Sequence, residues 1–273
     1  MSSITLLRDA GLSDASGSVI TGFKVNSQIN VPYGSLLVSN IRLFRNMFYI
    51  IDTGYLTGSS NWTIYNNIIF GILDGQNKSN NIIIQNNIFG NTNAGISGFN
   101  QPSVVIDHNL FINGNAFRDL RYAVITNNII TSSLGTQVMS GNVTQNTFNN
   151  NLSMSTNISP NAPTNSFLTG NTGAGNQVGV DPLFTSVTDF NNYNNTFNYR
   201  LQAGSPGKNA GTDATDLGIY GGVYPFPSGG APGSGFDTSA SPPIPQITSM
   251  NIQNASVVPG TLLKVTVQAN VNN

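Results

Sequence analysis

Three aspartates and two arginines have the spacing that a catalytic or metal-binding stripe needs. The phrases YIID, GILD, GISG and AFRD recur at intervals of 21 to 24 residues, and three of them end in aspartate. Carboxylates arranged in this way can act as general acid and base on a glycosidic bond, or can bind a cation. If the phrases stack, one column holds Asp52, Asp74, Gly98 and Asp119, with Arg118 and Arg121 close by. The inward column, two residues earlier, then holds Ile50, Ile72, Ile96 and Phe117.

Asp52 and Asp74 are the candidates for a metal site. Residues on neighbouring coils of a stacked β fold lie about 4.8 Å apart. Two carboxylates at that distance repel each other, so either one takes up a proton at a raised pKa or a cation lies between them. Calcium accepts carboxylate, amide and backbone oxygens in irregular geometry, and we expect calcium at this pair. The alternative is a solvated ladder in which Arg118 or Arg121 forms an ion pair.

His108 is the only histidine of the chain. It shares a column of the repeat with Arg45, which is three coils away, about 14 Å at the strand spacing. Asp107 precedes it, and consecutive side chains of a strand point to opposite faces. No nucleophile, base and orienting group can therefore be assembled around His108, and we expect a corner or surface histidine. The sequence contains no glycine-rich phosphate loop and no metal-spaced histidines.

Six short phrases between residues 43 and 148 indicate the elements that carry these side chains. They are LFRNMF, IYNNII, IQNNIF, IDHNLF, ITNNII and VTQNTF, and their asparagines are separated by 21, 20, 22, 19 and 18 residues. A period near twenty predicts a solenoid, in which each repeat buries its apolar side chains by stacking on its neighbours. The asparagines are Asn46, Asn67, Asn87, Asn109, Asn128 and Asn146.

The repeats predict β-strands rather than helices. Isoleucine, valine and phenylalanine fit a half-buried pleated surface, whereas asparagine is a poor helix former. The predicted fold class is therefore all-β, a parallel β-helix. We expect the repeated asparagines to adopt the left-handed conformation at corners and their amides to form a ladder. VITGFKVN is expected to be the first coil, with Asn26 as its asparagine. Two positions before each phrase lies an inward column, made of Ile41, Trp62, Ile82, Val104, Ala123 and Gly141.

The composition excludes several classes of function. Only 8% of the residues are charged, no glutamate occurs, and the net charge is −1. Such a chain has no electrostatic footprint for nucleic acid or for an anionic membrane, and no apolar run is long enough for a bilayer. Cysteine is absent, which excludes disulfides and thiol catalysis. No signal peptide is visible at the start of the sequence.

Several phrases carry a resemblance to a known group of proteins. ITGF at 20–23 and the NNII and HNLF phrases are followed by DPLF, YRL, GSPGKNAG and DLGIYGG between residues 181 and 222. This series resembles the right-handed parallel β-helix proteins of the pectate-lyase-like superfamily, in particular secreted and surface proteins of Bacteroidetes type. The resemblance implies export to the cell surface or beyond, and it covers residues 18–225. Lyases of that group use a basic residue and, in many cases, calcium.

The chain divides into three segments by composition. Residues 1–224 are expected to form the β-helix, with an N-terminal cap and a C-terminal closing module whose last strand crosses the end of the stack. Residues 225–245 are a Pro/Gly/Ser linker. Residues 246–273 contain two strand-like runs, which predict either the start of a truncated Ig-like domain or a hairpin that packs on another surface.

Two functions remain open. The scarcity of ionisable residues favours a non-catalytic extracellular module of a larger surface or secreted protein: a rigid spacer, an adhesin or a glycan-contacting surface. The alternative is a polysaccharide lyase or glycoside hydrolase that uses the aspartate stripe with Arg118 or Arg121. In both cases the expected partner is a polysaccharide. The strand edges at the two ends of a solenoid also allow self-association.

Overall fold

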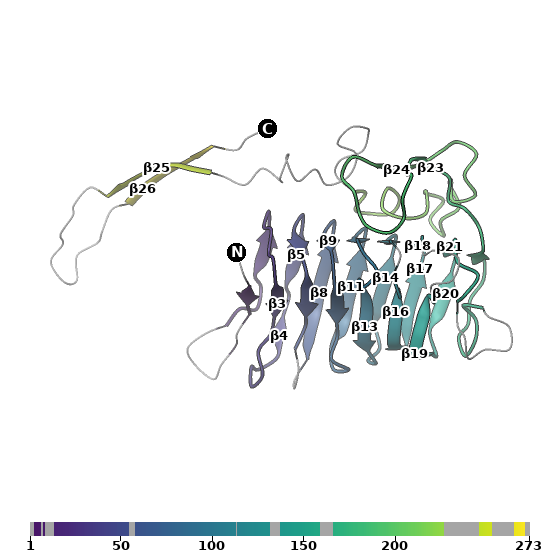
Figure 1. The fold of residues 1–273 in the computed structure, drawn as a ribbon. Coiled ribbons are helices and arrows are strands. Elements are labelled where there is room, and N and C mark those ends of the chain that lie inside the picture. Colours follow the sequence, from purple (N-terminus) through teal and green to yellow (C-terminus); the bar gives the residue numbers. More distant parts are fainter. Residues whose placement is uncertain are drawn as a thin grey trace.

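The computed structural model describes residues 3–6, 8, 14–54, 58–112, 114–131, 137–158, 166–226, 246–252 and 265–270. In this part of the chain every regular element is a β-strand. Three parallel sheets stack into a solenoid of about seven turns (Figure 1). The predicted all-β fold, a parallel β-solenoid, is therefore confirmed.

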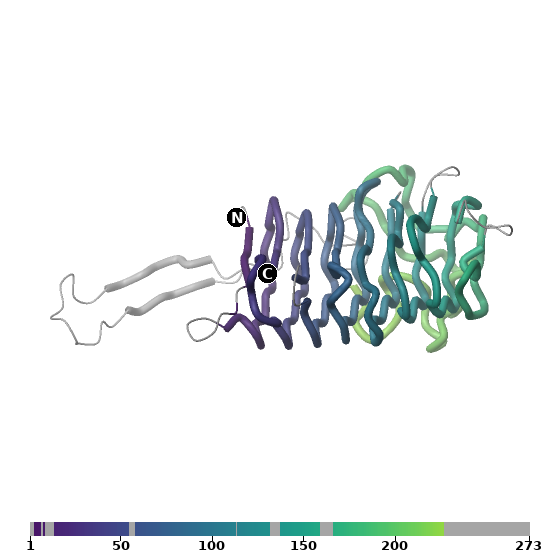
Figure 2. The backbone as a smooth tube through the Cα atoms, turned by 90° about the horizontal axis from the view of Figure 1, so that it is seen from below, coloured from purple at the N-terminus to yellow at the C-terminus, as the bar shows by residue number. Residues whose placement is uncertain are grey.

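From β5 to β21 (residues 42–153) the chain visits the three sheets in a repeated order. Figure 2 shows the resulting turns side by side along the solenoid. Sheet 1 contains β1 (Ile4–Thr5), β3 (Gln28–Asn30), β7 (Ile50–Asp52), β10 (Ile72–Asp74), β13 (Gly95–Phe99), β16 (Phe117–Arg121) and β19 (Met139–Thr144). Sheet 2 contains β2 (Val19–Thr21), β5 (Arg42–Phe44), β8 (Ser59–Tyr65), β11 (Asn80–Gln85), β14 (Val104–Asp107), β17 (Ala123–Thr126) and β20 (Thr147–Asn149), and β4 (Val38–Ser39) pairs with β8. Sheet 3 contains β6 (Met47–Phe48), β9 (Ile68–Ile69), β12 (Ile88–Phe89), β15 (Leu110–Phe111), β18 (Ile129–Ile130), β21 (Leu152–Ser153) and β22 (Gln177–Val178).

The expected inward column lies on the face of sheet 2 that points into the solenoid. Ile82 lies between Trp62 and Val104 in register, and all three are fully buried. Trp62 is a core residue whose Nε1 donates a hydrogen bond to the carbonyl of Val38 at 3.1 Å. Gly141 is the exception, because it is exposed and lies in sheet 1. The interior is therefore a continuous apolar stack, to which burial of each side chain contributes about 2 kcal/mol.

A ladder of buried asparagines marks the corner between sheets 2 and 3. Asn87 illustrates the pattern: its Oδ1 accepts from both nitrogens of Asn67, and its Nδ2 donates to Oδ1 of Asn109 and to two carbonyls. These bonds satisfy polar groups that burial would otherwise leave unpaired, so the predicted ladder is confirmed. Its members are Asn46, Asn67, Asn87, Asn109, Asn128, Asn151 and Asn176.

Two details of the predicted ladder are wrong. Asn146 belongs to a second corner, between sheets 1 and 2, where it bonds to Asn171; the sixth member of the ladder is Asn151. The phrase around Asn146 follows the same pattern as the others, but its first two residues belong to β19, which lies in sheet 1. In the first coil the position of the ladder asparagine is taken by Phe23, whose backbone N–H bonds to Asn46, and not by Asn26.

The left-handed residue at this corner is the one that precedes each ladder asparagine. The ladder asparagines themselves do not have positive φ, so the expected left-handed conformation of these residues is also wrong. An alternating strand cannot turn the corner without one such residue, and asparagine is the side chain that tolerates it best. This corner column consists of Arg45, Asn66, Asn86, His108, Asn127 and Asn150, with φ between 51° and 58°.

The closing module covers the outer face of sheet 3. Its antiparallel strands β23 (Phe184–Ser186) and β24 (Asn198–Leu201) and the segment after them pack apolar side chains on that sheet. The last part, residues 210–222, does not cross the end of the stack as expected: it runs along the corner between sheets 2 and 3 (Figure 1). We name residues 210–222 the strap. The second apolar cluster joins Met47, Ile68, Ile88, Leu110, Ile129 and Leu152 to Phe184, Tyr199, Leu201, Leu217, Ile219 and Phe226.

The C-terminal part contains the two expected strands. β25 (Gln246–Ile252) and β26 (Val265–Asn270) form an antiparallel pair. Residues 227–245, which make up most of the predicted linker, lie outside the described residues, as does the turn between the two strands. The assignment of this pair to an Ig-like domain stays a prediction.

Candidate functional site

The structure brings Asp52 and Asp74 together as the sequence predicts. The two residues are direct partners in the parallel ladder of β7 and β10, at the outer face of sheet 1. The rest of the predicted column is wrong by one residue: Asp74 faces Ser97, and Ser97 faces Arg118. The inward residues of these strands are accordingly Ile51 and Leu73, and not Ile50 and Ile72.

The error lies in the alignment of the short phrases: ILD of β10 pairs with GIS of β13, so Asp74 faces Ser97 and not Gly98. Gly98 and Asp119 have positive φ, 69° and 48°, and the pairing of β13 with β16 skips both, since Ser97 faces Arg118 and Phe99 faces Leu120. Asp119 therefore leaves the ladder, and its Oδ1 accepts a hydrogen bond from the backbone N–H of Asn142 at 2.9 Å.

Asp52 and Asp74 are half-buried, and the protein uses one oxygen of each to close a turn. Oδ1 of Asp52 accepts the N–H of Gly54, and Oδ1 of Asp74 accepts the N–H of Gln76, both at 2.9 Å. The Gln76 amide also donates to Oδ2 of Asp52 at 3.3 Å. Burial raises the pKa of both carboxyls, and the charge of Asp74 raises that of Asp52 further. Protonation of one carboxyl or a cation bound between the two would relieve this repulsion.

Two adjoining hollows lie on the outer face of sheet 1 and share Ser97 and Arg118. Their volumes are about 230 and 660 Å³. The first is lined by Ile72, Thr92, Asn93, Gly95, Ile96, Ser97, Asn115 and Arg118. The second is lined by Asp74, Gln76, Asn77, Ser97, Gly98, Asn100, Arg118, Asp119, Arg121 and Asn142. We call the two together the groove.

The groove combines amides, hydroxyls and two arginines. Nε of Arg118 donates to Oγ of Ser97 at 3.3 Å, which holds the guanidinium at the junction of the two hollows. Among the described residues, neither Arg118 nor Arg121 forms an ion pair with Asp119, so the expected ion-paired ladder is absent from this part of the chain. Both guanidinium groups are therefore available to an anionic ligand. No group of three or more histidine or aspartate side chains in the described residues is placed to hold a metal ion.

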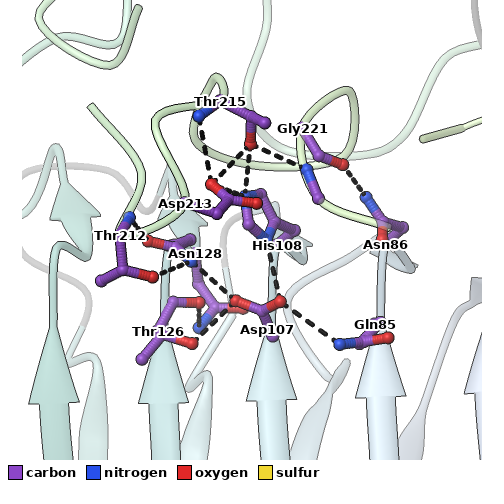
Figure 3. A network of polar contacts seen from close by, with 12 residues as sticks. Gln85, Asn86, Asp107, His108, Thr126, Asn128, Thr212, Asp213, Thr215 and Gly221 are labelled. Atoms are coloured by element: carbon purple, nitrogen blue, oxygen red, sulfur yellow. Dashed lines mark hydrogen bonds and ion pairs between the residues drawn. The ribbon is translucent and has the colours of Figure 1, made fainter. Parts of the chain in front are cut away.

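His108 is a corner residue, as predicted, but it is deeply buried. With a φ of 52°, His108 reverses the alternation of the strand, so its side chain and that of Asp107 converge instead of pointing apart. Nδ1 of His108 lies 2.9 Å from Oδ2 of Asp107, and Nε2 lies 3.1 Å from Oγ1 of Thr215 and 3.6 Å from Oδ1 of Asp213 (Figure 3). The expectation that Asp107 and His108 cannot act together is thus wrong.

Asp107 is bound from three sides. Thr126 and Asn127 donate to its Oδ1 at 2.7 and 2.9 Å, and Gln85 donates to its Oδ2 at 3.3 Å. Burial alone would raise the pKa of Asp107, but the hydrogen bond and charge of His108 and the bonds from Thr126 and Asn127 together lower it. Asp107 is accordingly ionised in the folded protein.

The order Asp107, His108, Thr215 resembles the arrangement of a nucleophilic triad, but it cannot act as one. Only 1% of His108 is exposed, so a substrate has no access to it. The Thr215 hydroxyl donates to Asp213 at 2.8 Å and accepts the N–H of Gly222 at 2.8 Å, so it is not free to attack. No local signal in the sequence pairs His108 with residues more than a hundred positions away.

No family model matches the chain, and no match to a curated protein is found. Within the described residues there is no helix with the length and apolar character needed to cross a membrane.

Proposed function

We propose that the chain is a non-catalytic module that contacts an acidic polysaccharide along the outer face of sheet 1. The observation that carries the proposal is the groove, whose two hollows meet at Arg118 and Ser97. Amide and hydroxyl side chains match the hydroxyl groups of sugars, and a guanidinium binds a carboxylate in two-pronged geometry. A stacked solenoid offers the same strand spacing at every coil, which suits an extended polymer.

The setting of the module is part of the proposal. The parallel β-solenoid and the phrases of the closing module support a relationship to pectate-lyase-like proteins of Bacteroidetes type. Under this proposal the chain lies at the cell surface or outside the cell, as a spacer, adhesin or glycan-contacting part of a larger protein. Self-association through the strand edges at the ends of the solenoid is a further proposal, and sedimentation at several protein concentrations tests it.

Titration with polygalacturonate, and with a neutral galactan as reference, tests the glycan proposal. We expect binding of polygalacturonate and a loss of affinity of at least about tenfold in Arg118→Gln, because a charged hydrogen bond contributes roughly 1.5 to 3 kcal/mol. The matched control is Arg42→Gln, which removes an exposed arginine from sheet 2 and should leave binding unchanged. Equal losses in the two variants, or no binding of polygalacturonate, alginate or chondroitin sulfate, would refute the proposal.

A lyase or glycoside hydrolase is the second candidate, because one observation favours it. Asp74 and Asp119 line the same hollow as Arg118, and burial raises the pKa of Asp74, as a general acid requires. Incubation with the same polysaccharides should then produce unsaturated uronates, detected by ultraviolet absorbance, or new reducing ends, and Asp74→Asn should abolish both. Absence of both products over a prolonged incubation rejects this candidate and leaves the non-catalytic one.

A further inference from the structure

The corner column of left-handed residues is the surface on which the strap docks. Nδ2 of Asn86 donates to the carbonyls of Ile219 and Gly221 at 3.1 and 2.8 Å. Nδ2 of Asn150, at the other end of the column, donates to the carbonyl of Ala210 at 2.8 Å. Because every left-handed residue turns its side chain out of the strand, the column presents a row of donors to the strap.

Asn127 shows how closely the strap follows this row. Its Oδ1 accepts the N–H of Thr212 at 2.8 Å, its Nδ2 donates to Oγ1 of Thr212 at 3.0 Å, and its carbonyl accepts the N–H of Gly218 at 2.8 Å. The strap also carries Leu217 and Ile219, which pack on sheet 3. Docking of the strap therefore seals an apolar face as well as a polar corner.

His108 takes the place of an asparagine in the column. The positions before and after it along the solenoid are Asn86 and Asn127. An imidazole differs from an amide in one respect that matters here, because it can gain and lose a proton near neutral pH. The ring packs against the backbone of the strap: a Cβ added to Gly222 would lie 2.8 Å from its Nδ1, so a side chain at this position would displace the ring or the strap.

The hydrogen bonds around the ring specify its protons. The Thr215 hydroxyl has a single proton, which it donates to the Asp213 carboxylate. In the hydrogen bond between Nε2 of His108 and Oγ1 of Thr215, at 3.1 Å, the ring must then be the donor, so Nε2 carries a proton. Nδ1 is buried and faces the ionised Asp107 at 2.9 Å, although off the direction of a well-aligned hydrogen bond. A lone pair at that place would repel the carboxylate, whereas a second proton makes an ion pair.

We propose that His108 is doubly protonated when the strap is docked, and that loss of its second proton releases the strap from the solenoid. The strap contributes Asp213 and Thr215 to the ring, and β14 contributes Asp107. The side chains on either side, Asn86 and Asn127, carry no charge. The imidazolium is thus the single positive charge between two carboxylates, and it joins two parts of the chain that are far apart in the sequence.

The sign of the pH dependence follows from these contacts. The docked strap supplies one of the two carboxylates that favour the second ring proton, so docking and protonation strengthen each other. Docking is therefore complete while the ring is charged and weakens as the pH rises and the ring loses that proton. On the acid side, the pKa of Asp107 is lowered, so its pairing is lost only as the pH falls below the usual range of aspartate.

Nitrogen-15 NMR of the ring tests the proton count directly, since the chain has only one histidine. At about pH 6, both ring nitrogens should show the shifts of an imidazolium with protons attached. A neutral ring with a proton on Nε2 alone at this pH would overturn the proposal. Asp213→Asn removes one of the two carboxylates beside the ring and should reduce the fraction of doubly protonated rings at this pH.

Hydrogen–deuterium exchange of the strap tests the release. In the parent protein, corrected protection of the Thr212, Gly218 and Gly222 amides should fall by about tenfold or more between about pH 6 and about pH 9. His108→Asn restores the residue type of the neighbouring positions and tolerates the left-handed backbone, so it should fold with protection independent of pH. Equal pH dependence in the variant and the parent, or none in the parent, refutes the switch. If the variant does not fold, Asp213→Asn serves instead, because its release should begin at lower pH than in the parent.

Discussion

The corner under the strap and the groove of sheet 1 are built from the same residue types, and they differ in what covers them. In the corner, Asp107, His108 and the asparagine amides are bound by the chain itself. In the groove, Arg118 and Arg121 face solvent, and Asp119 is bonded by its Oδ1 to one backbone N–H. Polar side chains that the protein satisfies internally stabilise the fold, whereas those left unsatisfied at the surface are available to a ligand.

The same difference separates two aspartates. Asp107 has a lowered pKa because donors and a positive ring surround it, although burial opposes this. Asp74 has a raised pKa because burial outweighs its hydrogen bond and the attraction of Arg118. Depth of burial alone therefore does not decide whether the pKa of a carboxyl group is raised or lowered. The number of hydrogen-bond donors that neighbouring segments provide to it decides the direction.

The largest expected effect is on stability, when a charge is placed on the face of sheet 3 that the closing module covers. The same change on the open outer face of sheet 1 is the comparison. Ile129→Asp places a carboxylate in the apolar cluster between sheet 3 and the closing module, where Ile129 is 1% exposed. We expect a loss of at least about 4 kcal/mol in the free energy of unfolding, measured by chemical denaturation. Ile72→Asp, on the outer face of sheet 1, should cost less than about 1 kcal/mol. Similar losses in the two variants would show that the closing module does not seal sheet 3.

The asparagine ladder gives the next largest effect. Asn87→Leu removes the side-chain acceptor of two nitrogens of Asn67 and the amide donor to the carbonyls of Ile64 and Gln85. We expect a loss of about 3 kcal/mol or more, because each unsatisfied buried group costs roughly 1 to 3 kcal/mol. Asn93→Leu, in the groove, is the matched control and should change the stability by less than about 0.5 kcal/mol. A melting temperature of Asn87→Leu equal to that of the parent would contradict a structural role for the ladder.

The two aspartates should give pH profiles of opposite sign. For Asp107, whose folded pKa is lowered, the stabilisation is present above the usual aspartate range and is lost as the pH falls through the lowered value. For Asp74, whose folded pKa is raised, stability increases as the pH falls through the raised value. At about pH 7, Asp107→Asn should therefore destabilise and Asp74→Asn should stabilise, each by on the order of 1 kcal/mol after solvent screening. Unfolding free energies between about pH 3 and about pH 7 check this, and shifts of the same sign in both variants would disprove it.

Calcium should give the smallest effect. If the ion lies between Asp52 and Asp74, millimolar calcium should raise the melting temperature of the parent by a few degrees. Asp52→Asn/Asp74→Asn should lose this response, and the control Asp181→Asn/Asp189→Asn, in the closing module, should keep it. A parent protein that does not respond to calcium would refute the metal site and leave the Gln76 amide as the side-chain donor to this pair.

The sequence predicts the fold well because stacking is a local repetition. Each phrase has an apolar residue that must face inward and an asparagine that must bond to its copy, so the period determines the architecture. The register is harder to predict where the period breaks. The left-handed residues Gly98 and Asp119, the register shift between β16 and β19, and the second corner at Asn146 are irregularities that the short phrases do not reveal. The predicted aspartate column was for that reason right for Asp52 and Asp74 and wrong for Asp119.

The sequence by itself determined the strands, the apolar interior and the ladder, because these depend on contacts between neighbouring copies of one repeat. Only the tertiary structure decided that His108 is buried between Asp107 and Asp213, because the strap returns along the corner from more than a hundred residues away. It also decided that Ser97 and Arg118 share a groove, since these two residues, and not Gly98 and Asp119, are partners in the ladder. Local periodicity specifies how the chain stacks on itself. The packing of a distant segment on the solenoid and the irregular register of the strands specify which polar groups remain exposed.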